Sequence, residues 1–377
     1  MKQNIHVALV GLRFGAEFIP IYLHHPNVRA LTIVDIDAQQ VTKWSKAYGV
    51  QRTAASLEAI LADPDIDAVH LVTPIPLHAQ QSIQVLKSGR HCACTVPAAT
   101  SLDDLHALVE AQHASGKVYM MMETAVYTRE FLLAQEWLRR GDLGRIQLLR
   151  GAHYQDMEGW PEYWMGLPPM HYATHAVGPL LRLAGTHATH VHCFGSGTMR
   201  DELKQRYGNP YPTETAIMRL ANSPVAAEVT RTLFETARDY TESFTVYGSA
   251  ASFEWQQLEA EAPLKFAFTE QKTYWGSFAV GHERLTVPDR ADLLPEAISR
   301  FTRRGVYDAT NADRSFVHGG GHGGSHPHLV HEFVSAIHTG RPSSIDAATA
   351  AEWTAVGICA HQSAMADGNR VDVPMFR

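Results

Sequence analysis

Residues 5–18 read IHVALVGLRFGAEF, and this stretch decides the fold of the first third of the chain. Its first six residues form an apolar run that is typical of a buried strand, and the run stops at Gly11. The residues that follow lead into a helical stretch. A strand, a tight glycine turn and a helix N-terminus together form an anion site, because backbone N–H groups and the helix dipole hold a pyrophosphate. The stretch therefore predicts a dinucleotide-binding unit.

An acidic residue stands where such a unit needs one. A second apolar strand, residues 30–34, ends at Asp35, about twenty residues after the glycines. A carboxylate there accepts hydrogen bonds from ribose hydroxyls and repels a 2′-phosphate, so the sequence favours NAD over NADP. The glycine pattern itself has Arg13 at its second glycine position and Ala16 at its third, where alanine is accepted. We expect the Arg13 side chain to turn outward, toward a phosphate or into solvent.

The β-α rhythm continues to about residue 125. Strands are predicted at 67–72, 91–95 and 118–122, and helices at 79–88 and 101–115. Ligands of such sheets bind beyond the carboxyl ends of the strands. The predicted cofactor-binding residues are Gly11, Arg13, Phe14, Gly15, Ala16, Asp35, Thr73, Pro74, His78, Thr95, Pro97 and Glu123.

The remaining two thirds indicate a second domain of a different class. At 377 residues the chain is longer than one core usually serves, and we place the domain boundary near residue 125. Alternating segments at 146–152, 214–220, 225–234, 242–247 and 252–255 predict a large, mainly antiparallel sheet, whereas residues 257–315 suggest only extended segments and loops. The expected fold is α/β: a Rossmann domain at 1–125 and an α+β domain at 126–377.

Residues 170–179 bring together groups suited to acid–base chemistry. Read as a helix, the stretch places His171 and His175 on one face, with Tyr172 beside them. An imidazole and a phenol presented together suit proton abstraction beside a carbonyl. The alternative is a core helix whose histidines bond to backbone carbonyls. Glu123, which ends the strand at 118–122, has a similar pair of interpretations: a group that bonds the cofactor ribose or the substrate, or a surface acid.

Other polar groups suggest substrate contacts. His153 and Tyr154 follow a predicted strand, and His322 and His326 lie in the glycine- and histidine-rich segment 318–328. Metal binding by His171, His175 and His326 is an alternative, but nicotinamide chemistry needs no metal and we predict none. Two arginines, Arg231 and Arg238, can grip an acidic sugar substituent, although pairing with Glu228, Glu235 or Glu242 is favoured.

Bulk properties exclude several classes of protein. The formal net charge of −7, with no dense cluster of basic residues, argues against nucleic-acid binding. No apolar run is long enough to cross a bilayer, so no membrane partner is expected. The four cysteines show neither metal spacing nor a disulfide framework. We expect a cytoplasmic protein that acts on a small molecule.

These motifs, taken in order, resemble those of the Gfo/Idh/MocA family of NAD(P)-dependent sugar oxidoreductases. The resemblance rests on the glycine turn, Asp35, Thr73-Pro74…His78 and Gly89-Arg90-His91…Pro97. It implies a carbohydrate substrate and a homodimer or homotetramer formed through the second sheet. Ordinary members carry a proton-relay lysine at the position of Val96. Valine cannot move a proton, so another group must do so.

Within that family, the variant residues look most like the NAD-dependent glycosidases of glycoside hydrolase family 109. Tyr172 and His175 match the catalytic pair of that group, and Glu123 matches its active-site acid. The resemblance implies a glycosidase that works by transient oxidation at C3, elimination, water addition and re-reduction. Alternatives are an NAD-dependent sugar or cyclitol dehydrogenase in which His175 replaces the lysine, and a non-catalytic NAD(H)-binding sensor. The sequence leaves open the sugar, the anomer and the aglycone.

Overall fold

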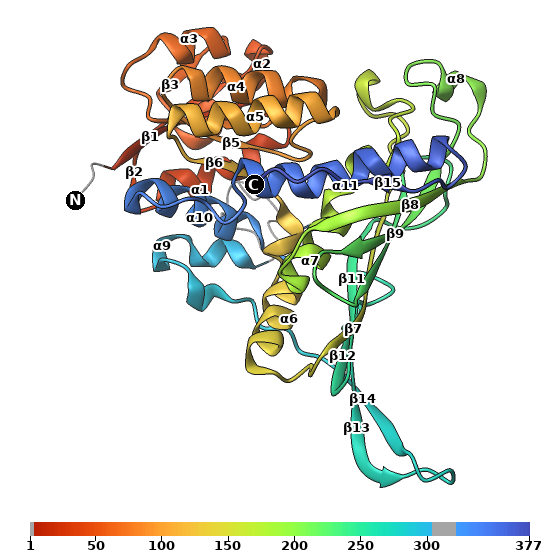
Figure 1. Cartoon of the computed structure of the whole chain (residues 1–377). Coiled ribbons are helices and arrows are strands. Elements are labelled where there is room, and N and C mark those ends of the chain that lie inside the picture. Colours follow the sequence, from red (N-terminus) through yellow and green to blue (C-terminus); the bar gives the residue numbers. More distant parts are fainter. Residues whose placement is uncertain (1–3, 304–321) are drawn as a thin grey trace. The chain divides into compact units, whose positions relative to one another are not determined.

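The computed structural model describes residues 4–303 and 322–377, and the chain forms two compact units (Figure 1). The first unit contains Met1–Thr128, Asp289–Ala351 and Phe376–Arg377. The second contains Arg129–Pro288 and Glu352–Met375. The first unit thus runs slightly past the boundary expected near residue 125 and also takes in residues from the C-terminal part of the chain. The sequence had placed residues 289–351 and 376–377 in the second domain.

A six-stranded parallel sheet forms the core of the first unit. Its order is β3-β2-β1-β4-β5-β6. The strands are β1 Ile5–Val10, β2 Val28–Val34, β3 Arg52–Ala54, β4 Ala68–Leu71, β5 His91–Cys94 and β6 Tyr119–Met121. Strands β1 and β4 are buried along their whole length, as expected for apolar strands covered on both faces. The strand order reverses between β1 and β4, the place where such sheets bind their ligands. The predicted Rossmann fold is confirmed.

Helices follow most of these strands. They are α1 Ile19–His24, α2 Ala38–Tyr48, α3 Leu57–Ala62, α4 His78–Lys87, α5 Leu102–Ser115, α9 Glu296–Ser299 and α10 His326–Thr339, with short 3-10 turns η1 Gly15–Phe18, η2 Ile75–Leu77, η3 Thr124–Val126, η6 Ala291–Leu293 and η7 Arg300–Thr302. The glycine turn therefore opens into the 3-10 turn η1 before the short helix α1 begins. Helix α10 packs on α1, so a late segment of the chain completes this unit.

The second unit is built on a nine-stranded sheet of order β14-β13-β12-β11-β7-β10-β9-β8-β15. Its strands are β7 Ile146–Tyr154, β8 Ala188–Ser196, β9 Thr213–Leu220, β10 Ala226–Thr232, β11 Thr241–Gly248, β12 Ala251–Glu254, β13 Leu264–Lys272, β14 Phe278–Arg284 and β15 Val371–Asp372. Strands β7 and β10 are parallel, and all other neighbouring strands of this nine-stranded sheet are antiparallel. The predicted mainly antiparallel sheet is confirmed.

Helix α7 lies against the middle of this sheet. The helices of the unit are α6 Arg129–Arg140, α7 Thr174–Ala184, α8 Asp201–Lys204 and the part of α11 Ala347–Met365 from Glu352 on, with 3-10 turns η4 Glu162–Trp164 and η5 Pro169–Tyr172. Helix α7 packs on β7, β10 and β11. Gly151 of β7 allows this close approach, because a Cβ there would lie 2.4 Å from the carbonyl oxygen of Ala176. Because Ala176 lies this close to β7, its neighbour His175 is also held beside the sheet.

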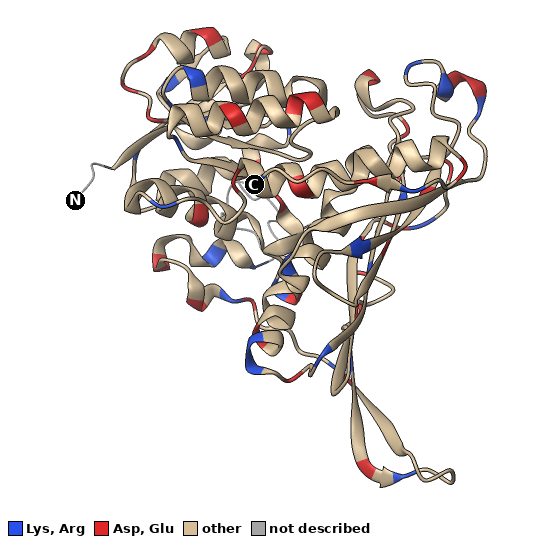
Figure 2. Ribbon diagram, in the orientation of Figure 1, with Lys and Arg blue, Asp and Glu red and all other residues tan. Residues whose placement is uncertain are grey.

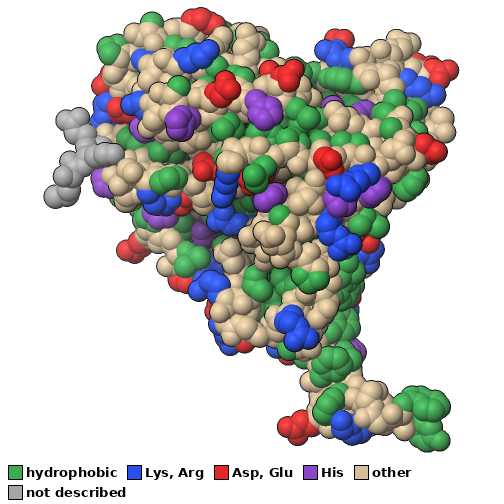
Figure 3. All heavy atoms as spheres, in the orientation of Figure 1, with side chains coloured by type: hydrophobic (Ala, Val, Ile, Leu, Met, Phe, Trp, Pro, Cys, Tyr) green, Lys and Arg blue, Asp and Glu red, His purple; other side chains and the backbone are tan. Residues whose placement is uncertain are grey.

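The surface is mixed in charge and carries one conspicuous apolar arm. Figure 2 shows acidic and basic residues interspersed on both units. In Figure 3, hydrophobic side chains gather on the β13–β14 hairpin, where Tyr274 and Trp275 are 92% and 87% exposed. No helix within residues 4–303 and 322–377 is long and apolar enough to cross a membrane. The oligomeric state stays a prediction.

Candidate active site

The glycine turn of the first unit has the conformation that a dinucleotide fingerprint requires. Gly11 has a φ of 92°, and a Cβ on it would lie 2.2 Å from the carbonyl oxygen of Val72. Only glycine fits a left-handed backbone this close to a neighbouring strand end. Arg13 is exposed, as expected, whereas Gly15 and Ala16 are buried. An arginine is therefore tolerated at the second glycine position because its side chain points away from the packed turn.

Asp35 is tied directly to this turn. Its Oδ2 accepts a hydrogen bond of 2.7 Å from the backbone N–H of Leu12, and its Oδ1 accepts one of 2.8 Å from that of Asp37. An ionised carboxylate has about four acceptor positions, so both oxygens can also receive ribose hydroxyls. The glycine turn and the half-buried Asp35 thus fit NAD, and they are the groups that the sequence predicted for the phosphates and the ribose.

His78 holds two loops of the same unit from within. Its ring is buried, with Nε2 2.7 Å from the carbonyl oxygen of Thr73 and Nδ1 2.8 Å from that of Pro97. Carbonyl oxygens only accept, so a ring that donates to both of them is in the imidazolium form. The hydroxyl of Thr95 also lies 3.3 Å from Nε2. Burial lowers the pKa of His78, but Cys94 and the two carbonyl acceptors outweigh it and raise the pKa to about 9. His78 therefore cross-links the loops after β4 and β5.

The other predicted residues of this unit lie at its strand ends or beside the glycine turn. Glu123 is fully buried after β6 and accepts a hydrogen bond of 2.9 Å from the N–H of Ala125. Nδ1 of His326 lies 3.2 Å from Oε2 of Glu17, and the rings of His322 and His326 pack against Phe14. Contacts of Glu123, His322 and His326 with substrate stay predictions, and the segment 318–321 lies outside the described residues.

The second unit presents a row of buried polar residues across four neighbouring strands. The row runs Glu214 (β9), Arg231 (β10), His153 (β7) and Glu242 (β11), each residue being the register partner of the next. Their exposed fractions are 0%, 0%, 0% and 7%. Register partners point to the same face of a sheet. That face is the one covered by α7, because Gly151, two residues before His153, contacts α7.

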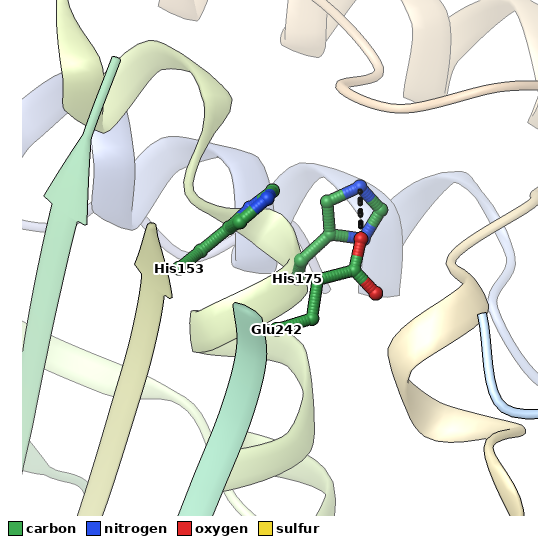
Figure 4. Close-up of side chains that lie close together, drawn as sticks. All are labelled: His153, His175 and Glu242. Carbon is green, nitrogen blue, oxygen red and sulfur yellow. Dashed lines mark ion pairs between the residues drawn. The ribbon is translucent and has the colours of Figure 1, made fainter. Parts of the chain in front are cut away.

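His175 of α7 completes the group, which we call the His175 cluster: His153, Tyr172, His175, Arg231, Tyr240 and Glu242. Nε2 of His175 lies 3.3 Å from the hydroxyl of Tyr172 and 3.6 Å from Oε1 of Glu242. Figure 4 shows the imidazole of His175 facing the carboxylate of Glu242, with His153 alongside. The hydroxyl of Tyr240 donates to the same Oε1. One imidazole nitrogen therefore faces both a phenol and a carboxylate.

Arg231 supplies a buried positive charge beside this group. Its guanidinium donates to the backbone carbonyls of Tyr172, His153 and Thr232 and to the side-chain oxygen of Gln155. Burial lowers the pKa of Arg231 to about 10, so it stays charged at neutral pH. The charge lies near Glu242 and 5.3 Å from the ring centroid of Tyr172. Arg231 thus holds the backbone of two cluster residues in place.

The favoured pairing of the two arginines with Glu228 or Glu235 was wrong, whereas Arg231 does interact electrostatically with Glu242. Arg231 donates to carbonyl oxygens, and Arg238 donates to the carbonyl oxygens of Asp239 and Gln257. Two of the expected partners pair elsewhere, Glu228 with Arg150 and Glu235 with Arg200. The error has a physical reason: sequence spacing does not reveal which strands become neighbours, whereas a buried guanidinium bonds to whatever acceptors surround it.

The expectation that His171 and His175 share one helical face was also wrong. The 3-10 turn η5 ends at Tyr172 and α7 begins at Thr174, so the two histidines belong to different elements. The ring of His171 packs on that of His361, with centroids 5.1 Å apart. Burial, reinforced by His361, lowers the pKa of His171 to about 3. His171 is therefore neutral at ordinary pH and lies apart from the contacts of His175.

Glu214, which the sequence analysis did not single out, anchors the turn that carries Tyr172. Its Oε1 lies 2.7 Å from Nδ1 of His361, and its Oε2 accepts a hydrogen bond of 2.8 Å from the N–H of Met170. Tyr240 was missed as well, and Glu242 was considered only as a partner for an arginine. The alternation within each strand was visible in the sequence, but the register that aligns Glu214, Arg231 and Glu242 was not.

A cavity of about 720 Å³ opens beyond the ends of β7 and β11. It is lined by polar and apolar groups of Asp156, Thr236, Ala237, Arg238, Asp239, Gln257 and Leu258. Tyr154, which alternates to the opposite face from His153, lies under the guanidinium of Arg238, with 5.7 Å between that group and the ring centroid. Of the two predicted substrate contacts on this strand, only His153 belongs to the His175 cluster.

The donor atoms of His153, His175 and Glu242 lie within 4.8 Å of one another, a spacing that a metal ion requires. This trio differs from the His171, His175 and His326 set considered from the sequence. The charges present argue against a divalent ion. The trio offers one carboxylate, whose charge Arg231 offsets, so the ion would add uncompensated positive charge to a buried site. The arrangement suits proton transfer better than metal binding.

Comparison with known proteins gives the same assignment. Residues 5–123 match the Gfo/Idh/MocA family model, described as an oxidoreductase family with an NAD-binding Rossmann fold. A Bacteroides fragilis relative named glycosyl hydrolase family 109 protein 1 is 23% identical, over 93% of this chain and 80% of its own length. The predicted resemblance is confirmed, and NAD is the cofactor of the first unit.

Solved structures extend the likeness in fold to the whole chain. A levoglucosan dehydrogenase in complex with NADH and L-sorbose has a TM-score of 0.76 at 21% identity, covering 99% of this chain and 100% of that one. The myo-inositol 2-dehydrogenase of Lactobacillus plantarum has a TM-score of 0.74 at 16% identity, with the same coverage. At these identities the likeness shows the fold.

Proposed function

We propose that this chain, a Gfo/Idh/MocA-type oxidoreductase in fold, hydrolyses a glycoside with NAD and without net redox change. One observation carries the proposal: Nε2 of His175 lies between the Tyr172 hydroxyl and the Glu242 carboxylate, in a chain with Val96 where ordinary relatives carry lysine. The chain thus keeps acid–base groups while lacking the ordinary relay. The relative named as a family 109 glycosyl hydrolase supports the same class.

The reaction follows from the acidity of a hydrogen beside a ketone. When bound, NAD supplies a temporary oxidation at C3 of the sugar and reverses it at the end. The C3 ketone acidifies the hydrogen on C2, a base removes that proton, and the C1 substituent leaves as the C1–C2 double bond forms. Water then adds to C1 while C2 regains a proton. The sum is one glycoside and one water giving a free sugar and the released alcohol.

Tyr172 and His175 are the proposed proton carriers. Their 3.3 Å contact allows a proton to pass from the phenol to Nε2, after which the phenolate oxygen can take a proton from the substrate. Histidine suits this work because its charge changes near neutral pH. Buried His153, 5.1 Å from His175 between ring centroids, is proposed to bond a sugar hydroxyl. His171 has no role in this scheme, since it packs on His361 instead.

The cavity beyond β7 and β11 is the proposed space for part of the substrate. Its volume of about 720 Å³ lies within the usual range for small-molecule sites. The carboxylates of Asp156 and Asp239 can accept hydrogen bonds from hydroxyls, and Arg238 can donate them. These groups suit a polyhydroxylated ligand. Tyr154, whose ring lies beneath Arg238, remains a proposed contact there. Glu123, His322 and His326 remain proposed contacts from the first unit.

The test is a paired assay on nitrophenyl glycosides, in which aglycone release and NADH absorbance are followed in one cuvette. The proposal predicts catalytic aglycone release, no stoichiometric NADH, and loss of activity when the cofactor is stripped. The double variant Tyr172→Phe, His175→Ala should be inactive, whereas His171→Gln serves as a matched control. NADH accumulating with free sugars, with no aglycone released, would make the chain an ordinary sugar or cyclitol dehydrogenase and reject the proposal.

A further inference from the structure

We propose that Glu242 is the positioning carboxylate of His175 and that Tyr240 holds Glu242 in place. The inference concerns two residues that neither the motif at 170–179 nor the comparisons assign. It rests on the proposed function for its kinetic readout, because the protons in question are those of that reaction. Its structural content, the coupling of one carboxylate to one imidazole, stands on contacts within the second unit and can be measured separately.

Glu242 occupies a place where an ionised carboxylate needs partners. It is 7% exposed, and burying such a charge is costly unless other groups compensate it. The compensation is at hand: the Tyr240 hydroxyl donates to Oε1, Nε2 of His175 lies 3.6 Å from the same oxygen, and charged Arg231 lies nearby. Helix α7, strand β10 and the residue just before β11 supply these groups. The carboxylate is therefore held by contacts that also fix its direction toward His175.

The contact matters most when His175 holds an extra proton. A neutral imidazole is attracted to a carboxylate only weakly. Once Nε2 takes the proton of Tyr172, a positive ring faces a negative carboxylate in a buried place, where water screens the attraction little. Glu242 thus stabilises the state in which His175 is protonated and keeps the imidazole ring oriented. A buried aspartate serves a catalytic histidine in the same way in serine proteases.

Tyr240 keeps Glu242 in the required state. Burial of its hydroxyl, together with the Glu242 carboxylate, raises the pKa of Tyr240 well above its usual value. It therefore remains a hydrogen-bond donor over the working pH range and does not compete as a base. The residue as a whole is 37% exposed.

The proton balance of the step is closed. The C2–H bond breaks and the proton goes to the phenolate oxygen of Tyr172, whose own proton has passed to Nε2 of His175. Glu242 stays ionised throughout, and the electron pair of the C2–H bond forms the new double bond as the C1 substituent leaves. The departing C1 oxygen takes up the proton that left C2, which gives the released alcohol and restores the relay. When water adds, its hydroxyl bonds to C1 and its remaining proton passes through the relay to C2. Tyr172 from η5 and Glu242 from β11 lie near Nε2 of His175, and the ring of His153 from β7 packs on it. Arg231 from β10 and Tyr240, just before β11, contact these three neighbours.

The decisive variant is Glu242→Gln, which keeps the shape and the acceptor for Tyr240 but removes the charge. We expect kcat for glycoside hydrolysis to fall by about 100-fold or more, with KM little changed, because the charge acts on the protonated state of His175. The acid limb of kcat/KM should move to lower pH, since the imidazolium loses its counter-charge. Glu228→Gln removes a carboxylate of the same sheet that pairs with Arg150, and it should change neither.

A second variant, Tyr240→Phe, is expected to shift the acid limb of kcat/KM in the opposite direction. Tyr240→Phe removes the donor that stabilises the carboxylate, so the charge becomes more available to His175 and the acid limb should move to higher pH. The expected loss of kcat is smaller, about threefold to tenfold. Opposite shifts in two variants cannot arise from general loosening of the fold. Should Glu242→Gln fail to fold, the direction of the Tyr240→Phe shift alone decides the matter.

A readout independent of turnover separates this inference from the proposed function. The titration midpoint of the His175 ring is followed by NMR on histidine-labelled protein, with the signal assigned from the His175→Asn variant. A lower midpoint in Glu242→Gln than in the native chain supports the coupling even if no glycoside is hydrolysed. An unchanged midpoint overturns it even if hydrolysis is efficient. One tightly bound zinc ion per chain, lost in Glu242→Gln, would also overturn it, because the metal would then occupy Nε2.

Discussion

Two buried histidines, one in each unit, differ in what their ring nitrogens face. In the first unit, both nitrogens of His78 point at backbone carbonyl oxygens, 2.7 Å and 2.8 Å away. In the second unit, one nitrogen of His175 lies between a phenol and a carboxylate. A carbonyl can only accept, so it keeps a proton on the His78 nitrogen that faces it; the Thr95 hydroxyl, 3.3 Å from Nε2, is a further neighbour. A phenol can give a proton and a carboxylate can stabilise it, so the proton of His175 can move.

The difference separates a structural imidazolium from a proposed acid–base imidazole. His78 is buried and has a raised pKa, like many catalytic groups, yet its nitrogens bond to the loops after β4 and β5. Burial and a perturbed pKa therefore do not identify the functional histidine on their own. The chemical nature of the neighbouring atoms does. The following predictions test this contrast.

The largest effect is expected from removing His175. His175→Ala should lower kcat by about 10³-fold, because general acid–base groups contribute roughly 10²–10⁴-fold and Tyr172 would lose its only proposed proton acceptor. Thermal unfolding of the variant should show that the fold is kept. Steady-state kinetics on the best nitrophenyl glycoside is the measurement. Activity within about tenfold of the native chain would remove His175 from the mechanism.

The second prediction concerns the contribution of Arg231 to folding stability. Arg231→Met should lower the free energy of unfolding by about 3–5 kcal/mol, because it removes the positive charge beside the buried carboxylate of Glu242 and the guanidinium that donates to the carbonyls of Tyr172 and His153. Urea unfolding provides the value. Arg238→Met, at a largely surface position of the same unit, is the matched control. A loss as small as that of the control would contradict the role assigned to Arg231.

His78 predicts a pH-dependent part of the stability. Its pKa in the folded chain is about 9, above the ordinary 6.5, so its contribution is fully present below pH 6.5 and is lost as the pH rises through 9. The full change corresponds to about 3 kcal/mol. Urea unfolding of the native chain and of His78→Gln at several pH values measures it. The difference between the two proteins should shrink as the pH rises; a constant difference would mean that His78 is neutral.

A substitution of Asp35 tests the preference of the first unit for NAD over NADP. Asp35→Ser keeps an acceptor for the N–H of Leu12 but removes the charge that disfavours a 2′-phosphate. We expect the ratio of NAD to NADP affinity to fall by about tenfold to 100-fold, which corresponds to roughly 1.4–2.8 kcal/mol. Calorimetric titration with each dinucleotide measures it. Unchanged preference would mean that the acid only braces the glycine turn.

The smallest effect is expected at His171, the neighbour that the sequence could not separate from His175. His171→Gln should leave kcat within about threefold, since its ring packs on His361 and lies outside the proposed relay. The same kinetic assay used for His175→Ala provides the comparison. A loss as large as that of His175→Ala would restore the single-face interpretation of the motif.

What the sequence predicted well was local. The strand–glycine turn–acid order of residues 5–35 depends on contacts between near neighbours, and the structure retains it, down to the tie between Leu12 and Asp35. Tyr172 and His175 were proposed from one short motif, and their side chains do meet. In both cases the residues that form the feature lie close together along the chain.

What the sequence could not supply was register. The row Glu214–Arg231–His153–Glu242 joins four strands, and a shift of one residue in any strand would turn its member to the opposite face. The end of the helix was also missed at 170–179. Ala173 leaves helical geometry, with φ −107° and ψ 2°, between η5 and α7. Glu214 holds the N–H of Met170 from a distant strand, a contact that no local pattern announces.

The central claim is redox-neutral glycoside cleavage through a proton removed from C2, and one measurement tests it most directly. Hydrolysis is run in deuterium oxide with NAD present, and the released sugar is examined by NMR. The account predicts deuterium at C2 and a normal hydrogen at C3, with the cofactor left in its oxidised form. A released sugar that keeps its original hydrogen at C2 would contradict it, because the C1 bond would then have broken without the step assigned to Tyr172, His175 and Glu242.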